Sequence, residues 1–364
     1  MNAPAPVFSP PDSAARAQPP TGHWLWQPHQ LPWSLLIHRR TLVVNLGLVL
    51  ALMVSSCVSL SAGTLPLSIT DVVKTLQGQG SAISGFVIGE LRGPRLLAAI
   101  FTGAAFALAG CLMQTLARNR LATPGIIGID NAATAFAVAS VVGTGISLAP
   151  QTMALAGAAC ATALAFGLAG ATGTRGYRFI IAGLAIGAIS GAITQVMLST
   201  VALDTANAAY PWTVGSLNAR SGGSVQLLGY GLGAGYLLAL MLGRHLNVLQ
   251  LPEAVATGLG LHPGRVRLAG LALSVILTGL AVSVAGPVAM VALIAPELAR
   301  TLSRQGRVPL TASILAGALL MVLSDLAGRT LLAPLEIPVG LVTTLAGSPC
   351  LLWILLRKSP VISQ

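Results

Sequence analysis

The chain has 364 residues, of which 54% are hydrophobic and only 8% are charged, and its mean hydropathy is +0.82. A soluble domain carries about 25% charged residues, so this composition excludes an ordinary soluble enzyme and indicates a membrane protein. The net charge of +11 does not indicate a nucleic-acid-binding protein, because the basic residues are spread over short segments between apolar stretches instead of forming one stripe.

The first 41 residues differ in character from the rest of the chain. They are rich in proline, as in Pro10-Pro11 and Pro19-Pro20, and they show no apolar periodicity. This composition is typical of a disordered segment. We therefore expect residues 1–41 to form a cytoplasmic tail, residues 42–358 to form the membrane domain, and residues 359–364 to form a second short tail.

Ten apolar stretches follow the tail, and nearly all approach the roughly 20 residues that a helix needs to cross the hydrocarbon core. They lie at 42–62, 95–117, 126–145, 148–171, 178–202, 224–243, 267–286, 289–303, 309–328 and 337–357. The predicted fold is an all-α polytopic membrane protein, a compact bundle of about ten transmembrane helices. An even number of spans places both termini on the same side, which we expect to be the cytoplasm.

The basic residues define the orientation of this bundle. Assigning the connecting segments alternately to two sides places 15 of the 20 Lys and Arg residues on one side, which is the cytoplasm by the positive-inside rule. The residues left on the outer side are Lys74, Arg92, Arg95, Arg220 and Arg329. Arginines on the side that carries few basic residues need an interaction partner. They therefore indicate an interaction at the outer face.

The sequence lacks the residues that would let this chain drive transport alone. It contains no G-x-x-x-x-G-K-[ST] motif, and Lys74 and Lys358 are its only lysines, so it cannot hydrolyse ATP through a P-loop. Acidic residues are nearly missing from the spans, and Asp130 near the start of one span and Asp325 near the end of another make a poor relay for an ion-coupled transporter. The five histidines are scattered, so no metal site is expected. An ion-coupled secondary transporter stays open as an alternative.

Four collinear segments carry a resemblance to a known family. They are residues 90–97 (ELRGPRLL), 118–128 (RNRLATPGIIG), 258–267 (GLGLHPGRVR, followed by AGP and LIAP), and 336–343 (EIPVGLVT, followed by GSP). In this order and at these separations, they resemble the permease subunits of type II ABC importers for iron-siderophores, haem and cobalamin. The resemblance covers roughly residues 42–357.

The resemblance implies an assembly and a location. It implies a multi-pass permease of the bacterial inner membrane, paired with a second permease that is the same chain or a paralogue. Two cytoplasmic ATPase subunits would bind ATP and Mg²⁺, and a periplasmic or lipid-anchored binding protein would deliver the cargo. The expected cargo is a ferric siderophore, with haem or cobalamin as alternatives. This chain is expected to bind no cofactor and to be no enzyme.

Three sets of site residues follow from matching the family's pattern. Arg92, Arg95 and Arg329 match outer arginines expected to dock acidic residues of the binding protein, although Arg329 could instead pair with Asp325 at i, i+4 spacing. Asn119 and Leu121 match the family's cytoplasmic gate, and Arg175 and Gly176 match a second gate segment by position only. Arg120 departs from the family because it stands where a proline is usual.

The segment 251–267 matches the family's coupling element, which carries movement of the ATPase to the bundle. Pro252 and Glu253 predict the start of a short helix there, and Pro263-Gly264 predict its end. The coupling residues expected are Glu253, Gly258, Gly260 and Arg265. Glu297 is a second departure, because the family commonly has histidine after that proline, and it is expected to pair with Arg300 or Arg304.

Overall fold

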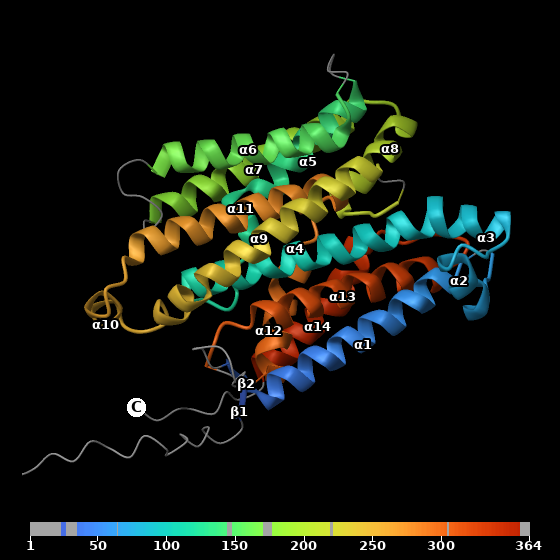
Figure 1. Cartoon of the computed structure of the whole chain (residues 1–364). Helices are drawn as coiled ribbons and strands as arrows, with labels where there is room; N and C mark the ends of the chain where they lie inside the picture. Colours follow the sequence, from blue (N-terminus) through green and yellow to red (C-terminus); the bar gives the residue numbers. More distant parts are fainter. Residues whose placement is uncertain are drawn as a thin grey trace, which may run out of the picture.

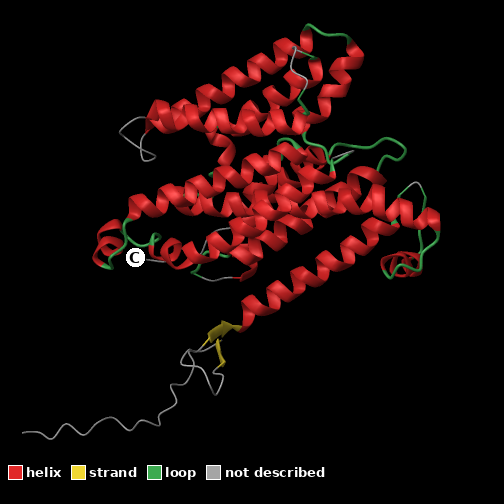
Figure 2. Cartoon of the chain, turned by 45° about the horizontal axis from the view of Figure 1, so that its top comes forward, coloured by secondary structure: helices red, strands yellow, loops and turns green. Residues whose placement is uncertain are grey.

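The computed structural model describes residues 23–26, 35–63, 65–143, 148–169, 177–218, 221–303 and 306–356, and almost all of them are helical (Figure 2). Its long helices are α1 (Arg39–Ser61), α4 (Gly93–Ala117), α5 (Ile129–Val142), α6 (Pro150–Ala169), α7 (Tyr177–Ser199), α9 (Gly222–Val248), α11 (Pro263–Ala285), α12 (Ala289–Ser303), α13 (Leu310–Thr330) and α14 (Val339–Leu356). Its short elements are β1 (His23–Trp26), β2 (Leu35–His38), α2 (Ile69–Leu76), α3 (Ala82–Phe86), the π-helix η1 (Val87–Arg92), the 3₁₀ helix η2 (Pro124–Ile127), α8 (Leu203–Val214) and α10 (Glu253–Gly258).

The long helices coincide with the apolar stretches in the sequence. Each of the ten predicted spans overlaps one of them over most of its length. Within the described residues, seven helices are long and apolar enough to cross a membrane by length and composition, and the stretches Ile129–Val142 and Val339–Trp353 are shorter apolar helices. Among the described residues, the predicted membrane domain is therefore all-helical. The β1–β2 hairpin, in which His23 pairs with His38, lies inside the predicted tail, whose other residues up to 34 lie outside the described part.

Helix α4 occupies the centre of the bundle (Figure 1), where it contacts α9, α11, α12 and α13. Nearly every side chain from Ala98 to Thr115 is buried. The sequence permits this because small residues let neighbouring backbones approach closely. Gly103 lies against the carbonyl group of Gly317 in α13, and Gly110 lies against the backbone of Ala292 in α12.

The same close approach recurs between α7 and the segment before α5. The sequence places Gly183, Gly187 and Gly191 at intervals of four, and two of them form the contact. A side chain on Gly183 would meet the backbone of Ile127, and one on Gly187 would meet Gly128. Small residues at helical spacing thus allow two backbones to approach closely at this contact.

The two ends of the bundle carry different short helices. Helix α10 lies at one end, and α2, α3 and α8 lie at the other (Figure 1). Helix α2 begins in a capping box, in which the Ser68 hydroxyl accepts from the Asp71 amide at 3.1 Å and the Asp71 carboxylate accepts from the Ser68 amide at 3.3 Å. The Ser68 hydroxyl also donates to that carboxylate at 2.6 Å and holds the pKa of Asp71 below its usual value. By connectivity, α2 and α3 follow α1, and α8 follows α7.

The packing of α4 predicts the effect of adding a side chain at its centre. A Cβ on Gly110 would lie 2.6 Å from the carbonyl carbon of Ala292, whereas one on Gly233 in α9 would meet nothing within 4 Å. Overpacking costs typically about 1–3 kcal/mol, so Gly110→Leu should lower the midpoint of thermal unfolding in detergent. Gly233→Leu is the matched control and should leave the midpoint nearly unchanged. Equal midpoints for the two variants would contradict this packing.

Candidate functional site

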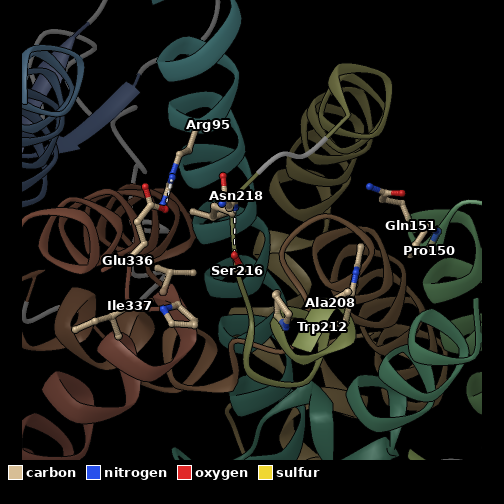
Figure 3. A pocket seen from close by; sticks show the side chains of 13 residues that line it. Arg95, Pro150, Gln151, Ala208, Trp212, Ser216, Asn218, Glu336 and Ile337 are labelled. Atoms are coloured by element: carbon tan, nitrogen blue, oxygen red, sulfur yellow. Dashed lines mark hydrogen bonds and ion pairs between the residues drawn. The ribbon is translucent and has the colours of Figure 1, made fainter. Parts of the chain in front are cut away.

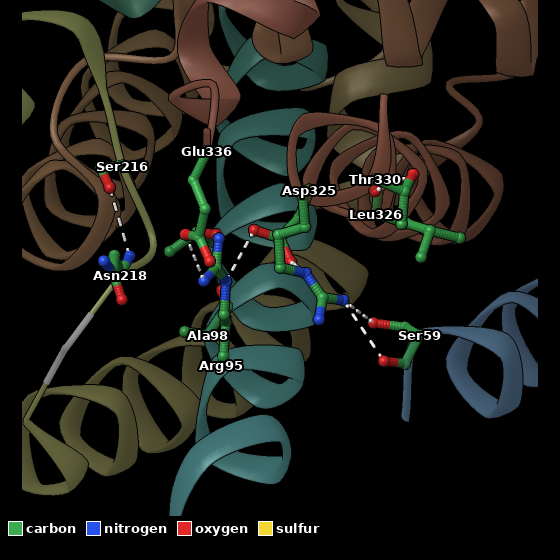
Figure 4. A network of polar contacts seen from close by, with 11 residues as sticks. Ser59, Arg95, Ala98, Ser216, Asn218, Asp325, Leu326, Thr330 and Glu336 are labelled. Atoms are coloured by element: carbon green, nitrogen blue, oxygen red, sulfur yellow. Dashed lines mark hydrogen bonds and ion pairs between the residues drawn. The ribbon is translucent and has the colours of Figure 1, made fainter. Parts of the chain in front are cut away.

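An ion-pair network joins four segments at the end of the bundle that carries α2, α3 and α8 (Figure 4). Arg95, in the first turn of α4, donates through Nε to Asp325 Oδ1 of α13 at 3.0 Å and through Nη1 to Glu336 Oε2 at 2.9 Å. The Asp325 side chain is 4% exposed. A carboxylate this buried needs partners, because losing water without them is costly.

Arg329 completes the network from α13. Its Nε lies 3.1 Å from Asp325 Oδ2, at the i, i+4 spacing that the sequence indicated as an internal alternative. Its Nη2 donates to the hydroxyl of Ser59 in α1 at 2.7 Å. The network therefore ties α1, α4, α13 and the segment before α14 together.

Arg92 has a separate structural role at the same end. This buried side chain donates through Nη1 to the Leu60 carbonyl at 2.7 Å and to the Ser61 carbonyl at 3.1 Å, and through Nη2 to the Leu65 carbonyl at 2.6 Å. These carbonyls include those left without intrahelical partners at the end of α1. Arg92 thus caps α1 and fixes the turn that follows it.

The three predicted outer arginines thus all form bonds within the chain. Arg92 is buried, whereas the side chain of Arg329 is 9% exposed and that of Arg95 is 16% exposed. The exposed acidic partner in the network is Glu336, with a side-chain exposure of 46%. A role in docking stays a prediction for all three arginines, and the structure adds Glu336 and Asp325, which the docking prediction did not include.

A pocket of about 440 Å³ opens beside this network (Figure 3). Arg95 and Glu336 line one part of it. Gln151 of α6, Trp212 of α8 and Asn218 line the rest, so the pocket lies between segments far apart in the sequence. Its volume is within the range of small-molecule sites.

A second network lies near the opposite end of the bundle, around the buried carboxylate of Glu297 in α12. Its Oε1 lies 3.1 Å from Arg120 Nη1, and its Oε2 lies 3.3 Å from Arg300 Nη1. Arg300 also donates to the side-chain oxygen of Gln114 in α4, whose amide donates to the Leu293 carbonyl at 3.1 Å. The expected pairing of Glu297 with Arg300 is present, while Arg304 lies outside the described residues.

The predicted gate residues belong to the loop 118–123, which connects α4 to η2. Asn119 Oδ1 accepts from the Leu121 amide at 2.9 Å, and the Asn119 carbonyl accepts from the Ala122 amide at 3.1 Å. The Leu121 side chain is exposed. Arg175 and Gly176, the second predicted gate segment, lie outside the described residues. The gate assignment therefore stays a prediction.

Arg118 links this loop to the coupling segment. It adopts a left-handed conformation, with φ of 50°, at the end of α4. Its Nη2 donates to the Leu249 carbonyl at 2.7 Å and to the carbonyl of Leu251. The loop is consequently bonded to the start of the segment 251–267 on one side and to α12 on the other.

The coupling segment contains the short helix α10, which begins at Glu253 after Pro252 as the sequence indicates. The helix ends at Gly258, well before Pro263, because Gly260 is in the left-handed region with φ of 80°. The expectation that Pro263-Gly264 ends it was wrong, because Pro263 is instead the first residue of α11. A proline suits that position, since its missing N–H has no partner there in any case.

The other coupling residues lie on or near this helix. Glu253 Oε2 is 3.7 Å from Arg267 Nη2, and Arg265 is exposed. A side chain on Gly258 or Gly260 would meet nothing within 4 Å, so space around both positions is open. Val255 and Leu259 are exposed apolar residues of this segment. Their roles in coupling stay predictions.

Comparison with known proteins places the chain in a family. The model of the FecCD transport family matches residues 51–357, and the chain belongs to this family. It is 35% identical over 320 residues to the achromobactin transport system permease protein CbrC of Dickeya dadantii (strain 3937), with 85% of this chain and 89% of the relative covered. It is 32% identical over 330 residues to the ferric enterobactin transport system permease protein FepG of Escherichia coli (strain K12), with coverages of 89% and 99%.

The similarity extends to solved structures. A metal-chelate type ABC transporter in an inward-facing conformation superposes with a TM-score of 0.74 at 26% identity, covering 88% of this chain and 100% of that one. The predicted resemblance to type II ABC importer permeases is therefore confirmed. The predicted number of spans and the location of the termini stay predictions.

The ion-pair network around Asp325 predicts how much individual charged side chains contribute to the stability of the folded protein. Removing one partner of a buried ion pair costs about 3–5 kcal/mol, because the other charge stays buried. Asp325→Asn, which leaves Arg329 without its carboxylate, should therefore markedly lower the midpoint of thermal unfolding. Glu336→Gln is the matched control and should cost about 0–1 kcal/mol, since Glu336 is partly exposed. If the midpoint of thermal unfolding of Asp325→Asn is no lower than that of Glu336→Gln, the network does not stabilise this end of the bundle.

Proposed function

We propose that this chain is the transmembrane permease subunit of an ATP-driven ABC importer that moves ferric siderophores from the periplasm to the cytoplasm of a bacterium. Family membership over residues 51–357 carries the proposal. The relatives named for achromobactin and ferric enterobactin support the choice of cargo. Haem and cobalamin are the alternative cargoes.

The proposed topology has ten spans in the inner membrane, with both termini in the cytoplasm. Each predicted span overlaps a long helix, and the positive-inside rule favours a cytoplasmic location for the end carrying α10. The helix α12 has only 15 residues, but it lies beside α4, α13 and α14 within the bundle. A helix buried among other helices can be shorter than one that faces lipid, because its ends need not reach both bilayer surfaces.

The proposed energy source is a pair of separate ATPase subunits that bind ATP and Mg²⁺. The sequence of this chain has no P-loop, so hydrolysis requires a partner. Val255 of α10 and Leu259, which directly follows this helix, present exposed apolar side chains at the proposed cytoplasmic end. Exposed apolar residues there are consistent with a surface that an ATPase covers. A second permease, the same chain or a paralogue, completes the transmembrane part.

The proposed docking site for the substrate-binding protein is the outer end around Arg95 and Glu336. A long-range attraction between charged surfaces orients such encounters more than it adds affinity. The pocket beside these residues opens at the same end, so a delivered cargo would enter the bundle there. Arg92 and Arg329 would support docking by fixing the outer ends of α1, α4 and α13.

The proposed partner subunits should copurify with this protein when it is isolated from its own host under iron starvation. Gentle detergent extraction followed by mass spectrometry should recover an ATPase with a P-loop, together with a paralogous permease if the transmembrane part is a heterodimer. Recovery of this chain alone, with gradient-driven uptake activity, would contradict the proposal and favour a secondary transporter.

The docking site predicts the effect of removing one acidic side chain. Glu336→Gln leaves Arg95 paired with Asp325 but removes one exposed negative charge. If the binding protein docks through acidic residues, its association rate with the purified assembly should rise severalfold at low salt. The effect should disappear at about 1 M salt, where the screening length is about 3 Å.

The control for this measurement is Glu253→Gln, which removes an exposed carboxylate from α10 at the opposite end. It should leave the association rate unchanged. A slower association for Glu336→Gln would mean that the outer face docks basic residues, which would contradict the assignment of Arg95.

A further inference from the structure

The loop 118–123 carries two arginines that bond to different parts of the bundle. Arg118 binds the carbonyls of Leu249 and Leu251, where α9 passes into the coupling segment. Arg120, two residues later, pairs with Glu297 of α12. A single short loop therefore touches both the segment proposed to receive the ATPase and one of the helices packed against α4.

The loop is held together by its own hydrogen bonds. The Asn119 side chain accepts from the Leu121 amide, and the Asn119 carbonyl accepts from the Ala122 amide. Gln114, one turn before the end of α4, bonds to both the backbone of α12 and Arg300. A turn bonded in this way transmits a displacement of one end to the other more directly than a long flexible loop does.

The side chains of Arg120 and Glu297 differ strongly in their exposure to solvent. The Arg120 side chain is 67% exposed, whereas the Glu297 side chain is 6% exposed. Glu297 keeps a second partner, Arg300, at 3.3 Å. Removing Arg120 would therefore leave the buried carboxylate still paired. The Arg120 bond is thus not needed to satisfy Glu297, which leaves it available to form in one state of the transporter and break in another.

We propose that Arg120 and Glu297 form a latch that carries movement of the coupling segment, received through Arg118, to α12 and the central helix α4. This inference rests on the proposed importer function. Arg120 is a positioning residue in this scheme, because it acts by holding the loop and contacts no cargo. Energetic coupling between distant sites typically changes affinities by about 5-fold to 150-fold.

The test uses the complete importer, purified from its host and reconstituted in proteoliposomes, with radioiron-labelled ferric chelates of the catecholate, hydroxamate and citrate classes as probes. The measured quantity is chelate transported per ATP hydrolysed. Arg120→Gln should lower this ratio severalfold, with assembly and the midpoint of thermal unfolding unchanged. Arg120→Lys keeps the charge and should retain most of the coupling.

Two further variants distinguish the latch from a general effect of charge. Arg244→Gln removes an exposed arginine from the last turns of α9 and should behave like the wild type. Glu297→Gln should uncouple at least as strongly as Arg120→Gln, and the double variant should be no worse than Glu297→Gln alone. Mutations in one interaction fail to add, whereas independent ones add.

Two results would overturn the latch while leaving the importer function standing. One is a coupling ratio for Arg120→Gln equal to that of Arg244→Gln in an assembly that transports normally. The other is a double variant whose loss equals the product of the two single losses. A wild-type assembly that takes up none of the chelates with ATP would instead reject the proposed function, and the latch with it.

Discussion

The need to pair every charge that enters a low-polarity interior determines where this protein can place polar chemistry. The Coulomb attraction between two charges rises steeply as water is removed, but so does the cost of leaving one of them alone. Asp325 and Glu297 are two buried carboxylates that meet this need with arginines from other elements, whereas the buried Asp130 forms no ion pair within the described residues. Asp325 and Glu297 lie near opposite ends of the bundle, and α4, the helix between them, buries mainly alanine, glycine and leucine.

This distribution suits a subunit that changes shape without doing chemistry. Small apolar residues in the middle of the bundle allow neighbouring helices to shift relative to one another. An ion pair at a loop stabilises one arrangement of the helices until a conformational change separates the two charges. The network around Asp325 joins α1, α4 and α13, and the network around Glu297 joins α4, α12 and the loop that follows α4. Both networks act on α4, so a change at one end of the bundle has a physical connection to the other.

The sequence predicted the helices well because the bilayer restricts the choices. Spans must be apolar, helical and of a certain length, so hydropathy alone located a helix in each predicted span. Helices α2, α3 and α8 were harder to find. The pattern Ser68-Ile-Thr-Asp71 is a recognisable helix start, but it lies in a connection between two predicted spans. The hairpin of β1 and β2 lies in a segment whose proline content indicated disorder.

The contacts among the site residues could be predicted from the sequence only where the residues lie close together along the chain. Asp325 and Arg329 lie four residues apart on one helix, so their pairing could be anticipated from spacing. Arg95 and Asp325 are separated by 230 positions, and no local pattern connects them. Arg120 and Glu297 each departed from the family's pattern, which was a usable signal, but only the folded chain shows that the two departures meet.

The central claim is that ATP hydrolysed by partner subunits drives a ferric chelate through this chain. The most direct measurement is uptake of a radioiron-labelled ferric siderophore by proteoliposomes containing the purified assembly. Uptake should require ATP on the side that carries α10 and should persist when ionophores collapse every ion gradient. Uptake that needs a gradient and ignores ATP would contradict the claim, and it would direct attention to Asp130, the buried carboxylate in the first turn of α5.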